Sequence, residues 1–333
     1  MARTSRKPGE LASRIAITDT REGLPFSKGL LASSLTATGL SPSRAYRVAE
    51  KVEEVLRGRG TPTVTRTELR TVAADVLTRE VGERYARAYL NWESVGDREH
   101  PLAILIGGAT GVGKSTIATQ LAARLGIVRI VSTDSIREVM RAMLSPAMIP
   151  TLHVSSFKAD TALHDPIPPS VDRLLVAFGE QVAAVAVGVQ AILDRAVAEG
   201  TDVIIEGAHL VPGSIDLSAV EGAIVVPMII TVDDEDVHRS HFYTRGHEAR
   251  LRPQERYLSH FHSIRKIQRF VKSLALQKGI PIIPSYGLDA TLAAVIDLVV
   301  SKATADVQAG RQAVAQEVPG KGTRLGAKQE ATS

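Results

Sequence analysis

A glycine-rich segment from Gly108 to Ser115 carries residue types and a spacing that suit nucleotide phosphates. It reads Gly-Ala-Thr-Gly-Val-Gly-Lys-Ser, which matches the pattern G-x-x-x-x-G-K-[ST], and it lies between an apolar run and an amphipathic segment that ends at Gly126. Glycines let successive backbone N–H groups converge on phosphate oxygens, and a following helix points its positive end to the same place. Lys114 would span the β- and γ-phosphates, and the Ser115 hydroxyl would bind Mg²⁺.

A chance glycine-rich turn or a dinucleotide-binding loop could also contain such a run of glycines. The spacing does not match the dinucleotide pattern G-x-G-x-x-G, and such a loop has no use for a lysine at the start of its helix. We therefore predict that the segment binds ATP together with Mg²⁺. The predicted nucleotide contacts are Gly108, Ala109, Thr110, Gly111, Val112, Gly113, Lys114, Ser115 and Thr116.

A polar cluster, residues 132–137, follows the next predicted strand. The carboxyl ends of parallel strands lie at one edge of a sheet, so we expect this cluster beside the γ-phosphate. Asp134 could accept a proton from an acceptor hydroxyl, and Arg137, on the same helical face, could hold an anionic group of the acceptor. The alternative is that Asp134 caps the helix and Arg137 is solvated.

A second acid ends the apolar strand 202–206. P-loop enzymes place at such a strand end the carboxylate that holds Mg²⁺ or its waters, so Glu206 is the predicted metal ligand together with Ser115. The alternative is that Glu206 caps the following turn. His209 is a candidate substrate contact, although a lone loop histidine more often satisfies local hydrogen bonds.

A third cluster is rich in arginine and lies between two predicted helices, one starting near 234 and one near 253. A helix-loop-helix with arginines at its turn suits a lid that closes on the transferring phosphate. We predict that Arg245 is catalytic and that Arg250 and Arg252 bind substrate, with Arg256 in the same cluster. The alternative is a solvated basic helix pair.

The remaining pattern predicts the elements that position these residues. Residues 13–26 suggest a hairpin, and helical spacing follows over 27–38, 42–57, 66–79 and 81–93. Beyond a polar link near residue 96, apolar strands near 102–106, 128–131, 202–206, 223–231 and 281–284 alternate with helices, among them 171–199. We predict a small helical domain over 11–95, an α/β kinase domain over 96–302 and a disordered tail over 303–333.

Composition excludes several classes of protein. The hydrophobic fraction of 44% supports a buried core, and the absence of cysteine excludes disulfides and thiolate metal sites and fits the cytoplasm. The longest apolar run, 223–230, is far shorter than the roughly 20 residues of a membrane span, so we expect no membrane association. A net charge of +4 supports a small anionic ligand as readily as nucleic acid, and we expect no nucleic acid because basic residues are not interleaved with aromatic ones.

Several segments together resemble the 2-phosphoglycerate kinase family. The specific ones are Thr133–Arg141, Glu206-Gly207-Ala208-His209 with Pro212-Gly213, and Arg256-Tyr257-Leu258, and the likeness extends from about residue 11 to 300. It implies ATP-dependent phosphorylation of the 3-hydroxyl of 2-phosphoglycerate, giving 2,3-bisphosphoglycerate and ADP. It also implies a P-loop fold with a parallel five-stranded sheet, helices on both faces and a mostly helical ATP-cone-like domain before it.

Other functions stay open on the sequence alone. The enzyme could phosphorylate another small anionic hydroxy acid. The chain could also be an ATP-gated switch without turnover, in which the N-terminal unit and the P-loop unit bind ATP to control assembly or a partner. Because residues 18–23 depart from the usual ATP-cone hairpin, the N-terminal unit could instead serve only structure or homo-oligomer assembly. The kinase hypothesis requires Asp134, whereas the switch does not.

Overall fold

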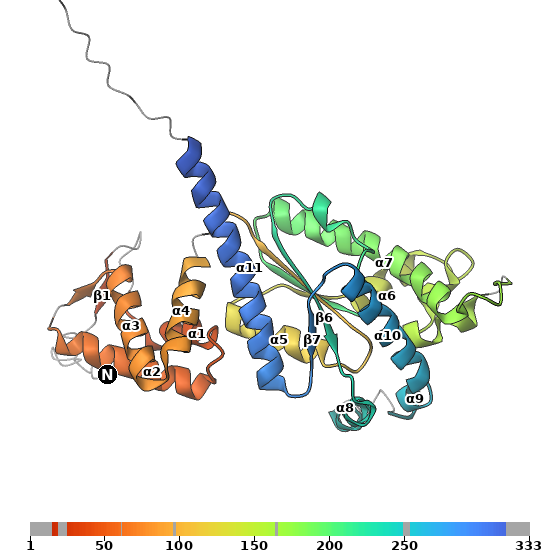
Figure 1. The fold of residues 1–333 in the computed structure, drawn as a ribbon, viewed down its shortest axis with the longest axis horizontal. Helices are drawn as coiled ribbons and strands as arrows, with labels where there is room; N and C mark the ends of the chain where they lie inside the picture. Colours follow the sequence, from red (N-terminus) through yellow and green to blue (C-terminus); the bar gives the residue numbers. More distant parts are fainter. Residues whose placement is uncertain are drawn as a thin grey trace, which may run out of the picture.

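The computed structural model describes residues 15–18, 25–60, 62–95, 98–163, 166–248 and 254–317. Within them, a helical N-terminal part precedes an α/β part with a five-stranded parallel sheet (Figure 1). This architecture confirms the predicted fold class.

The N-terminal part holds four helices, α1 (Lys28–Thr36), α2 (Pro42–Gly58), α3 (Arg66–Glu80) and α4 (Glu83–Val95). Local sequence sets their starts: Ser41 is the N-cap of α2 with Pro42 at its first position, and Thr65 and Glu68 form a capping box on α3. Their apolar faces share a core of their own that includes Leu35, Val52 and Leu77. The four predicted helices are therefore confirmed.

The predicted hairpin over 13–26 is only partly right. Strand β1 (Ala16–Ile17) pairs in parallel with β2 (Thr63–Val64), a partner far away in the sequence. An isolated antiparallel bridge joins Ala16 to Pro25, and the turn residues 19–24 lie outside the described residues. Local turn chemistry cannot reveal a pairing between segments separated by two helices.

The sheet of the α/β part has the order β4-β5-β3-β6-β7, and every strand pair in it is parallel. The strands are β3 (Leu102–Gly107), β4 (Ile130–Ser132), β5 (Val203–Gly207), β6 (Ile224–Thr231) and β7 (Ile282–Pro284). In register, Ile106 and Ser132 both face Glu206, so the segments after β3, β4 and β5 begin at one level of the same sheet edge. The predicted phosphate loop and both predicted acids are thereby brought together.

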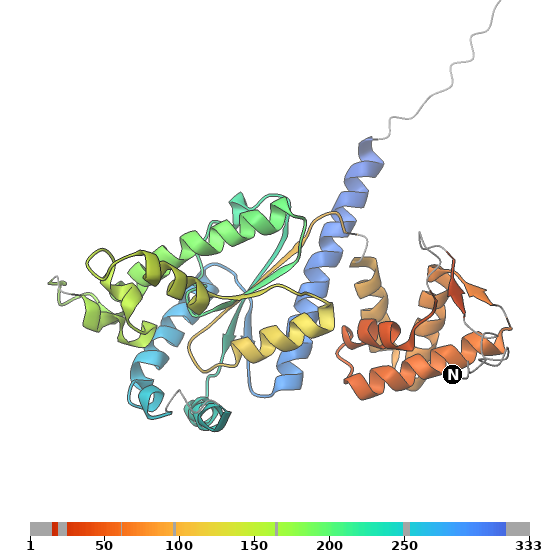
Figure 2. The ribbon, with the colours of Figure 1, turned by 180° about the vertical axis from the view of Figure 1, so that it is seen from behind.

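Helices cover both faces of this sheet (Figures 1 and 2). Side chains of β3 alternate: Leu102, Ile104 and Ile106 pack in the core with α5 (Lys114–Leu125), while Ala103 and Leu105 pack in the core with α7 (Arg173–Ala198). The remaining elements are α6 (Thr133–Met143), the 3₁₀ turns η1 (Pro150–His153), η2 (Ser156–Ala162) and η3 (Leu217–Ala219), and helices α8 (Glu235–Glu248), α9 (Gln254–Leu258), α10 (Phe261–Gln277) and α11 (Leu288–Glu317).

Helix α11 joins the two parts of the chain. It packs against α4 of the N-terminal part and against α5, β6 and β7 of the sheet, so it lies between them (Figures 1 and 2). The helix continues to Glu317, so residues 303–317 are helical although we expected a tail from 303. An alanine-rich sequence favours helix, and Ala303 is fully buried in the core. Residues 318–333 lie outside the described residues.

Helix α7 is long and apolar enough to cross a membrane by length and composition, although polar residues and glycines interrupt its apolar runs. Its buried residues include Phe178, Val185, Val189 and Leu193, and they belong to the cores on the sheet. Asp172 caps its first turn by accepting hydrogen bonds from the N–H groups of Leu174 and Leu175. We therefore describe α7 as a core helix of the α/β part.

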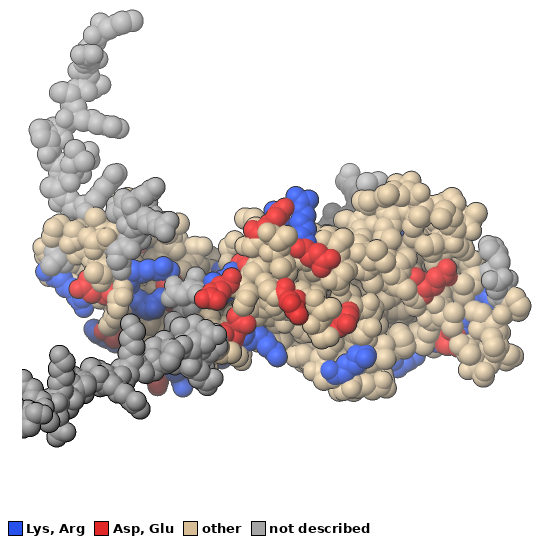
Figure 3. Space-filling model, turned by 90° about the horizontal axis from the view of Figure 1, so that it is seen from above, with Lys and Arg blue, Asp and Glu red and all other residues tan. Residues whose placement is uncertain are grey.

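One face of the molecule shows charged side chains of both signs. On the face drawn in Figure 3, Lys and Arg side chains of the described residues are interspersed with Asp and Glu. This mixture agrees with the mild net charge of +4.

Candidate active site

The loop between β3 and α5 has the backbone of a phosphate cradle. Gly108, Gly111 and Gly113 have φ of +138°, +88° and +91°, which side chains other than hydrogen rarely tolerate. Helix α5 begins directly at Lys114, so its positive end faces the loop. The predicted nucleotide contacts from Gly108 to Thr116 all lie in this loop or in the first turn of α5.

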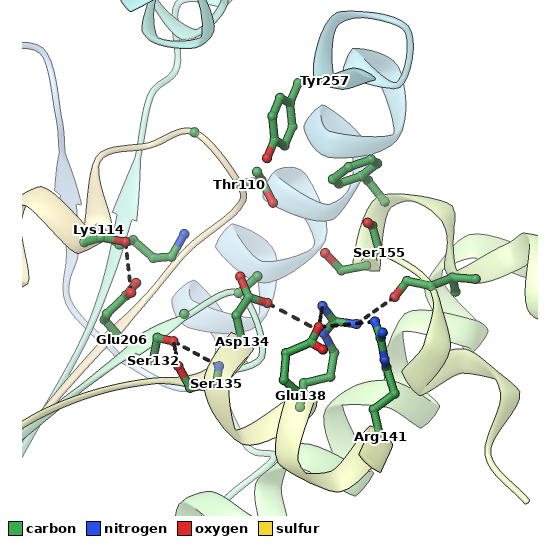
Figure 4. A pocket seen from close by; sticks show the side chains of 18 of the residues that line it. Thr110, Lys114, Ser132, Asp134, Ser135, Glu138, Arg141, Ser155, Glu206 and Tyr257 are labelled. Carbon is green, nitrogen blue, oxygen red and sulfur yellow. Dashed lines mark hydrogen bonds and ion pairs between the residues drawn. The ribbon is translucent and has the colours of Figure 1, made fainter. Parts of the chain in front are cut away.

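Lys114, Ser115 and Glu206 meet at the base of this loop. The Lys114 ammonium donates a hydrogen bond to the carbonyl oxygen of Ala109 at 2.7 Å, which holds the side chain back along the loop. The Ser115 hydroxyl donates to Glu206 Oε1 at 2.9 Å (Figure 4). Glu206 therefore points across the sheet edge to the loop instead of capping its own turn.

This pair fits Mg²⁺. A hydroxyl and a carboxylate oxygen lie side by side, and Mg²⁺ prefers oxygen ligands, of which protein commonly supplies only one or two. In the described part of the chain, His, Asp and Glu side chains do not gather in groups of three or more, as a metal cage built only from protein side chains would require. Ser115 and Glu206 could hold the ion with the remaining positions left to phosphate and water.

Asp134 projects into a cleft in front of the loop. The N-cap of α6 is Ser132, whose hydroxyl accepts from the N–H of Ser135 at 3.0 Å, so Asp134 is not needed as a cap. Its side chain is 72% exposed and lies between the loop residues and the outer turn of α6 (Figure 4). Asp134 is free to act on a bound molecule.

Arg137 makes more hydrogen bonds within the protein than we predicted. Its Nε lies 3.7 Å from Asp134, but Nη1 donates to the carbonyl oxygens of Leu152 at 2.9 Å and Val154 at 3.2 Å. The side chain thus ties the segment after α6 to the catalytic edge. Arg137 lines the cleft, and its Nε faces Asp134. Its Nη1 bonds to the carbonyl groups that form the cleft wall.

The cleft itself has a volume of about 590 Å³ and two distinct ends. One end is the phosphate loop with Thr110, Gly111, Lys114 and Ser115. The rest of the lining comes from α6, from residues 153–157 and from α9, and it presents Glu138, Arg141, Ser155, Ser156 and Arg256, with Tyr257 beside Thr110 of the loop (Figure 4). A cleft of this kind can hold a nucleotide phosphate at one end and a small anion at the other.

The structure does not support the prediction that His209 binds substrate. The side chain is 1% exposed and both ring nitrogens are used within the protein. Gln181 Nε2 donates to the carbonyl oxygens of Thr151 and Val154, so its Oε1 accepts from His209 Nε2 at 2.9 Å. Nδ1 then accepts from the Thr133 hydroxyl at 2.9 Å. His209 is a neutral link between the residue next to Asp134 and the wall at 151–154.

Two buried histidines should make stability depend on pH. Burial lowers the pKa of His209 to about 4, and burial likewise lowers the pKa of His238 to about 4. The unfolded chain binds these protons below about pH 6.5. The stabilisation by the neutral rings is therefore complete above that pH and is lost as the pH falls towards 4, on the order of 1 kcal/mol per pH unit for each ring.

We expect His209→Gln to flatten this dependence. Urea unfolding of the wild type and the variant at several pH values between 4.5 and 7.5 measures the slope. Gln277→Asn at an exposed position at the end of α10 changes no titratable group, and it serves as the control that should keep the wild-type slope. Equal slopes for His209→Gln and the wild type would contradict a neutral buried ring at this position.

Of the three predicted lid arginines, the described residues include only the backbone of Arg245, which lies in α8. Its side chain, Arg250 and Arg252 lie outside the described residues, so their roles stay predictions. Arg256 does line the cleft from α9.

The sequence did not reveal that residues of α8 contact the backbone of the phosphate loop. His238 Nε2 donates to the carbonyl oxygen of Thr110 at 2.9 Å, because its Nδ1 faces the Arg265 guanidinium, and His241 Nδ1 lies 2.9 Å from the carbonyl oxygen of Gly111. The Phe242 ring packs against Gly111. Their helical spacing indicated one shared face, but nothing local indicated which loop that face would contact.

This contact predicts a large effect for Gly111→Ala. A Cβ at Gly111 would lie 2.3 Å from Phe242 Cζ, and the φ of +88° would itself be strained by about 1–3 kcal/mol. We expect the KM for ATP to rise at least about tenfold, with partial recovery when Phe242→Ala is added, since only the clash is then relieved.

Gly179→Ala is the matched control, because a Cβ there meets nothing within 4 Å. Steady-state kinetics with varied ATP makes the comparison. Wild-type ATP kinetics in Gly111→Ala would contradict a loop held by α8.

Comparison with known proteins identifies relatives of the chain. Residues 21–98 match the family model of the ATP cone domain, and residues 87–157 match that of Zeta toxin. A 2-phosphoglycerate kinase from Methanothermobacter thermautotrophicus is 41% identical over 273 residues, which are 82% of this chain and 89% of that protein. The chain belongs to the 2-phosphoglycerate kinase family.

Other members of the family are similarly related. The 2-phosphoglycerate kinase of Methanocaldococcus jannaschii is 39% identical over 88% of this chain and 93% of its own length. That of Pyrococcus furiosus is 39% identical over 85% and 92%. Among solved structures, a gluconokinase from Sinorhizobium meliloti aligns with 66% of this chain at 15% identity and a TM-score of 0.32, a likeness too weak to support a conclusion.

Proposed function

We propose that this family member transfers the γ-phosphoryl group of ATP to the 3-hydroxyl of 2-phosphoglycerate, giving 2,3-bisphosphoglycerate and ADP. The observation that carries the proposal is the cleft that joins the phosphate loop to a wall containing Arg141 and Arg256, with Asp134 between the two ends. The relatives that match this chain are named 2-phosphoglycerate kinase, and the match covers 89% and 93% of the length of two of them. A substrate with a phosphate and a carboxylate suits such a wall.

In this mechanism the acceptor hydroxyl lies beside Asp134. As its oxygen attacks the γ-phosphorus, the hydroxyl proton passes to the Asp134 carboxylate, the new P–O bond forms and the bond to the β-phosphate oxygen breaks. Lys114 offsets the charge on the phosphate oxygens, and Arg137 keeps the Asp134 carboxylate oriented. ADP leaves with the electron pair of the broken bond.

Ser115 and Glu206 would hold Mg²⁺ in the same site. The bound ion neutralises charge on the phosphate oxygens and orients them for transfer. The lid that we predicted from Arg245, Arg250 and Arg252 would exclude water, which prevents hydrolysis of ATP in the absence of acceptor.

The domain division is also a proposal. We assign residues 11–95 to an ATP-cone-like unit and residues 96–302 to the kinase unit, and α11 begins in the kinase unit, continues beyond residue 302 and packs against α4. The protein would act in the cytoplasm on small molecules, as a monomer or a homo-oligomer.

An acceptor screen tests the function. The purified chain is incubated with ATP, Mg²⁺ and, in turn, 2-phosphoglycerate, 3-phosphoglycerate, D-glycerate and other hydroxy acids, and products are identified by mass. We expect the highest kcat/KM with 2-phosphoglycerate. Another preferred acceptor would replace the proposed substrate, and the absence of turnover with every acceptor would favour the ATP-gated switch.

A further inference from the structure

Two arginines line the cleft that carries the proposed function, but neither has yet been assigned to a particular group of the acceptor. Arg141 comes from the last turn of α6, one turn beyond Arg137, and Arg256 comes from α9. Both line the cleft, and Figure 4 shows Arg141 directed towards it beside Glu138 and below Ser155. Two separate elements thus bring guanidinium groups into one cleft, and Arg256 reaches Ser155 there.

The charges of these arginines are only partly compensated. Arg141 Nη1 contacts Glu138 Oε1 at 3.3 Å, but the same oxygen accepts from Arg137 Nη2 at 3.1 Å, so one carboxylate serves two cations. Arg256 Nη2 donates to the hydroxyl of Ser155, a neutral partner. Within the described residues, no Asp or Glu oxygen lies within 4 Å of Arg256. This end of the cleft therefore has spare positive charge and guanidinium donors suited to an anion.

The wall that carries the two arginines is held in place by packing. Tyr257, next to Arg256, stacks on Phe242 with ring centroids 5.1 Å apart and an interplanar angle of 12°. The Tyr257 ring also contacts Phe157, with centroids 5.7 Å apart. Arg137 and Gln181 together fix the carbonyl groups of residues 151–154 on the other side of Ser155. The arginines thus belong to a preorganised surface.

Chemistry decides which anion belongs there. The transferring phosphoryl group already has Lys114, the N–H groups of the loop and the start of α5. A second phosphate presents several acceptor oxygens, which suit two guanidinium groups and a hydroxyl better than a single ammonium. A carboxylate needs fewer donors, and one cation would satisfy it.

We infer that Arg141 and Arg256, together with the Ser155 hydroxyl, form the subsite for the phosphate that the acceptor already carries. This inference rests on the proposed function, and it names the residues that distinguish a phosphorylated acceptor from an unphosphorylated one. With the phosphate held at the far wall, the hydroxyl of the neighbouring carbon faces Asp134. Glu138 shares its carboxylate between Arg137 and Arg141 and keeps both in place before the acceptor enters.

The test uses 2-phosphoglycolate, which has the phosphate and the carboxylate but no hydroxyl to phosphorylate. Its Kd for the full-length chain is measured by calorimetry for the wild type, Arg141→Gln and Arg256→Gln, and the KM for ATP is measured beside it. We expect the Kd to rise about 10- to 100-fold in each variant, because each loses a charged hydrogen bond. The KM for ATP should stay within about twofold.

Matched controls separate the subsite from general effects. Arg195→Gln removes an arginine that is 73% exposed near the end of α7, outside the cleft, and it should bind 2-phosphoglycolate as the wild type does. Arg141→Lys keeps the charge but loses the planar guanidinium with its paired donors, so its Kd for 2-phosphoglycolate should lie between those of the wild type and Arg141→Gln. An unchanged Kd in both glutamine variants would overturn the subsite. An equal rise in the Kd and in the KM for ATP would overturn it as well, because the arginines would then act at the donor end or on the fold.

Failure of the proposed function gives a different result. Turnover of 2-phosphoglycerate by the wild type tests that function first, and it does not involve the variants. Binding of 2-phosphoglycolate needs no turnover, so the Kd values of the two glutamine variants, compared with those of the wild type and Arg195→Gln, test the subsite even if no acceptor is phosphorylated.

Discussion

Asp134→Asn is expected to lower kcat for the acceptor by about 10²- to 10⁴-fold, the usual contribution of a general base. Asparagine has nearly the same shape, but it cannot take the proton of the acceptor hydroxyl. The side chain is 72% exposed and does not cap α6, so the substitution should leave the fold intact. Steady-state kinetics with both substrates measures the effect.

The KM for ATP should change little in this variant, because Asp134 lies on α6 and the phosphate loop is a separate element. Glu83→Gln provides the comparison: it removes a carboxylate that is 74% exposed on α4, outside the cleft, and it should keep the wild-type kcat. A kcat for Asp134→Asn within about threefold of the wild type would remove Asp134 from the chemical step.

Lys114→Met is expected to produce the second large loss, about 10²- to 10³-fold in kcat, as removal of one preorganised donor to a developing charge typically does. The lysine is only 8% exposed and its ammonium lies against the loop, 2.7 Å from the carbonyl oxygen of Ala109. Methionine fills a similar volume without the charge. The loss should appear with any acceptor, because it affects the donor end.

Lys51→Met is the control for Lys114→Met. Lys51 is on α2, its side chain is 53% exposed, and it pairs with Glu54. Rates for the control should equal those of the wild type, and circular dichroism should show both variants folded. If Lys114→Met retained full turnover, the phosphate loop would not be the donor site.

Local pattern was sufficient to predict that the glycine-rich loop, Asp134 and Glu206 lie at one edge of the sheet. The loop and Asp134 each follow a strand and Glu206 lies at the end of one, and the carboxyl ends of parallel strands meet at one edge of a sheet. The register of Ile106 and Ser132 with Glu206 brings these three segments to one level. Nothing about tertiary contacts had to be known to infer that they share an edge.

The acceptor half could not be predicted in this way. The role of His209 depends on Thr133 and Gln181, two residues that are 76 and 28 positions away in sequence, and spacing carries no information about such partners. The same holds for His238 and His241, which act on a loop about 130 residues before them. Arg141 and Arg256 lie on separate helices, and only the fold brings both to one wall.

Direct transfer of phosphate between the two ends of the cleft is the central claim, and ³¹P NMR of the reaction with ATP, Mg²⁺ and 2-phosphoglycerate tests it most directly. We predict that the γ-phosphate signal of ATP decreases at the same rate as the two signals of 2,3-bisphosphoglycerate grow, with no inorganic phosphate. Release of inorganic phosphate with 2-phosphoglycerate unchanged, or phosphorylation of a different acceptor in its place, would contradict direct transfer to this substrate.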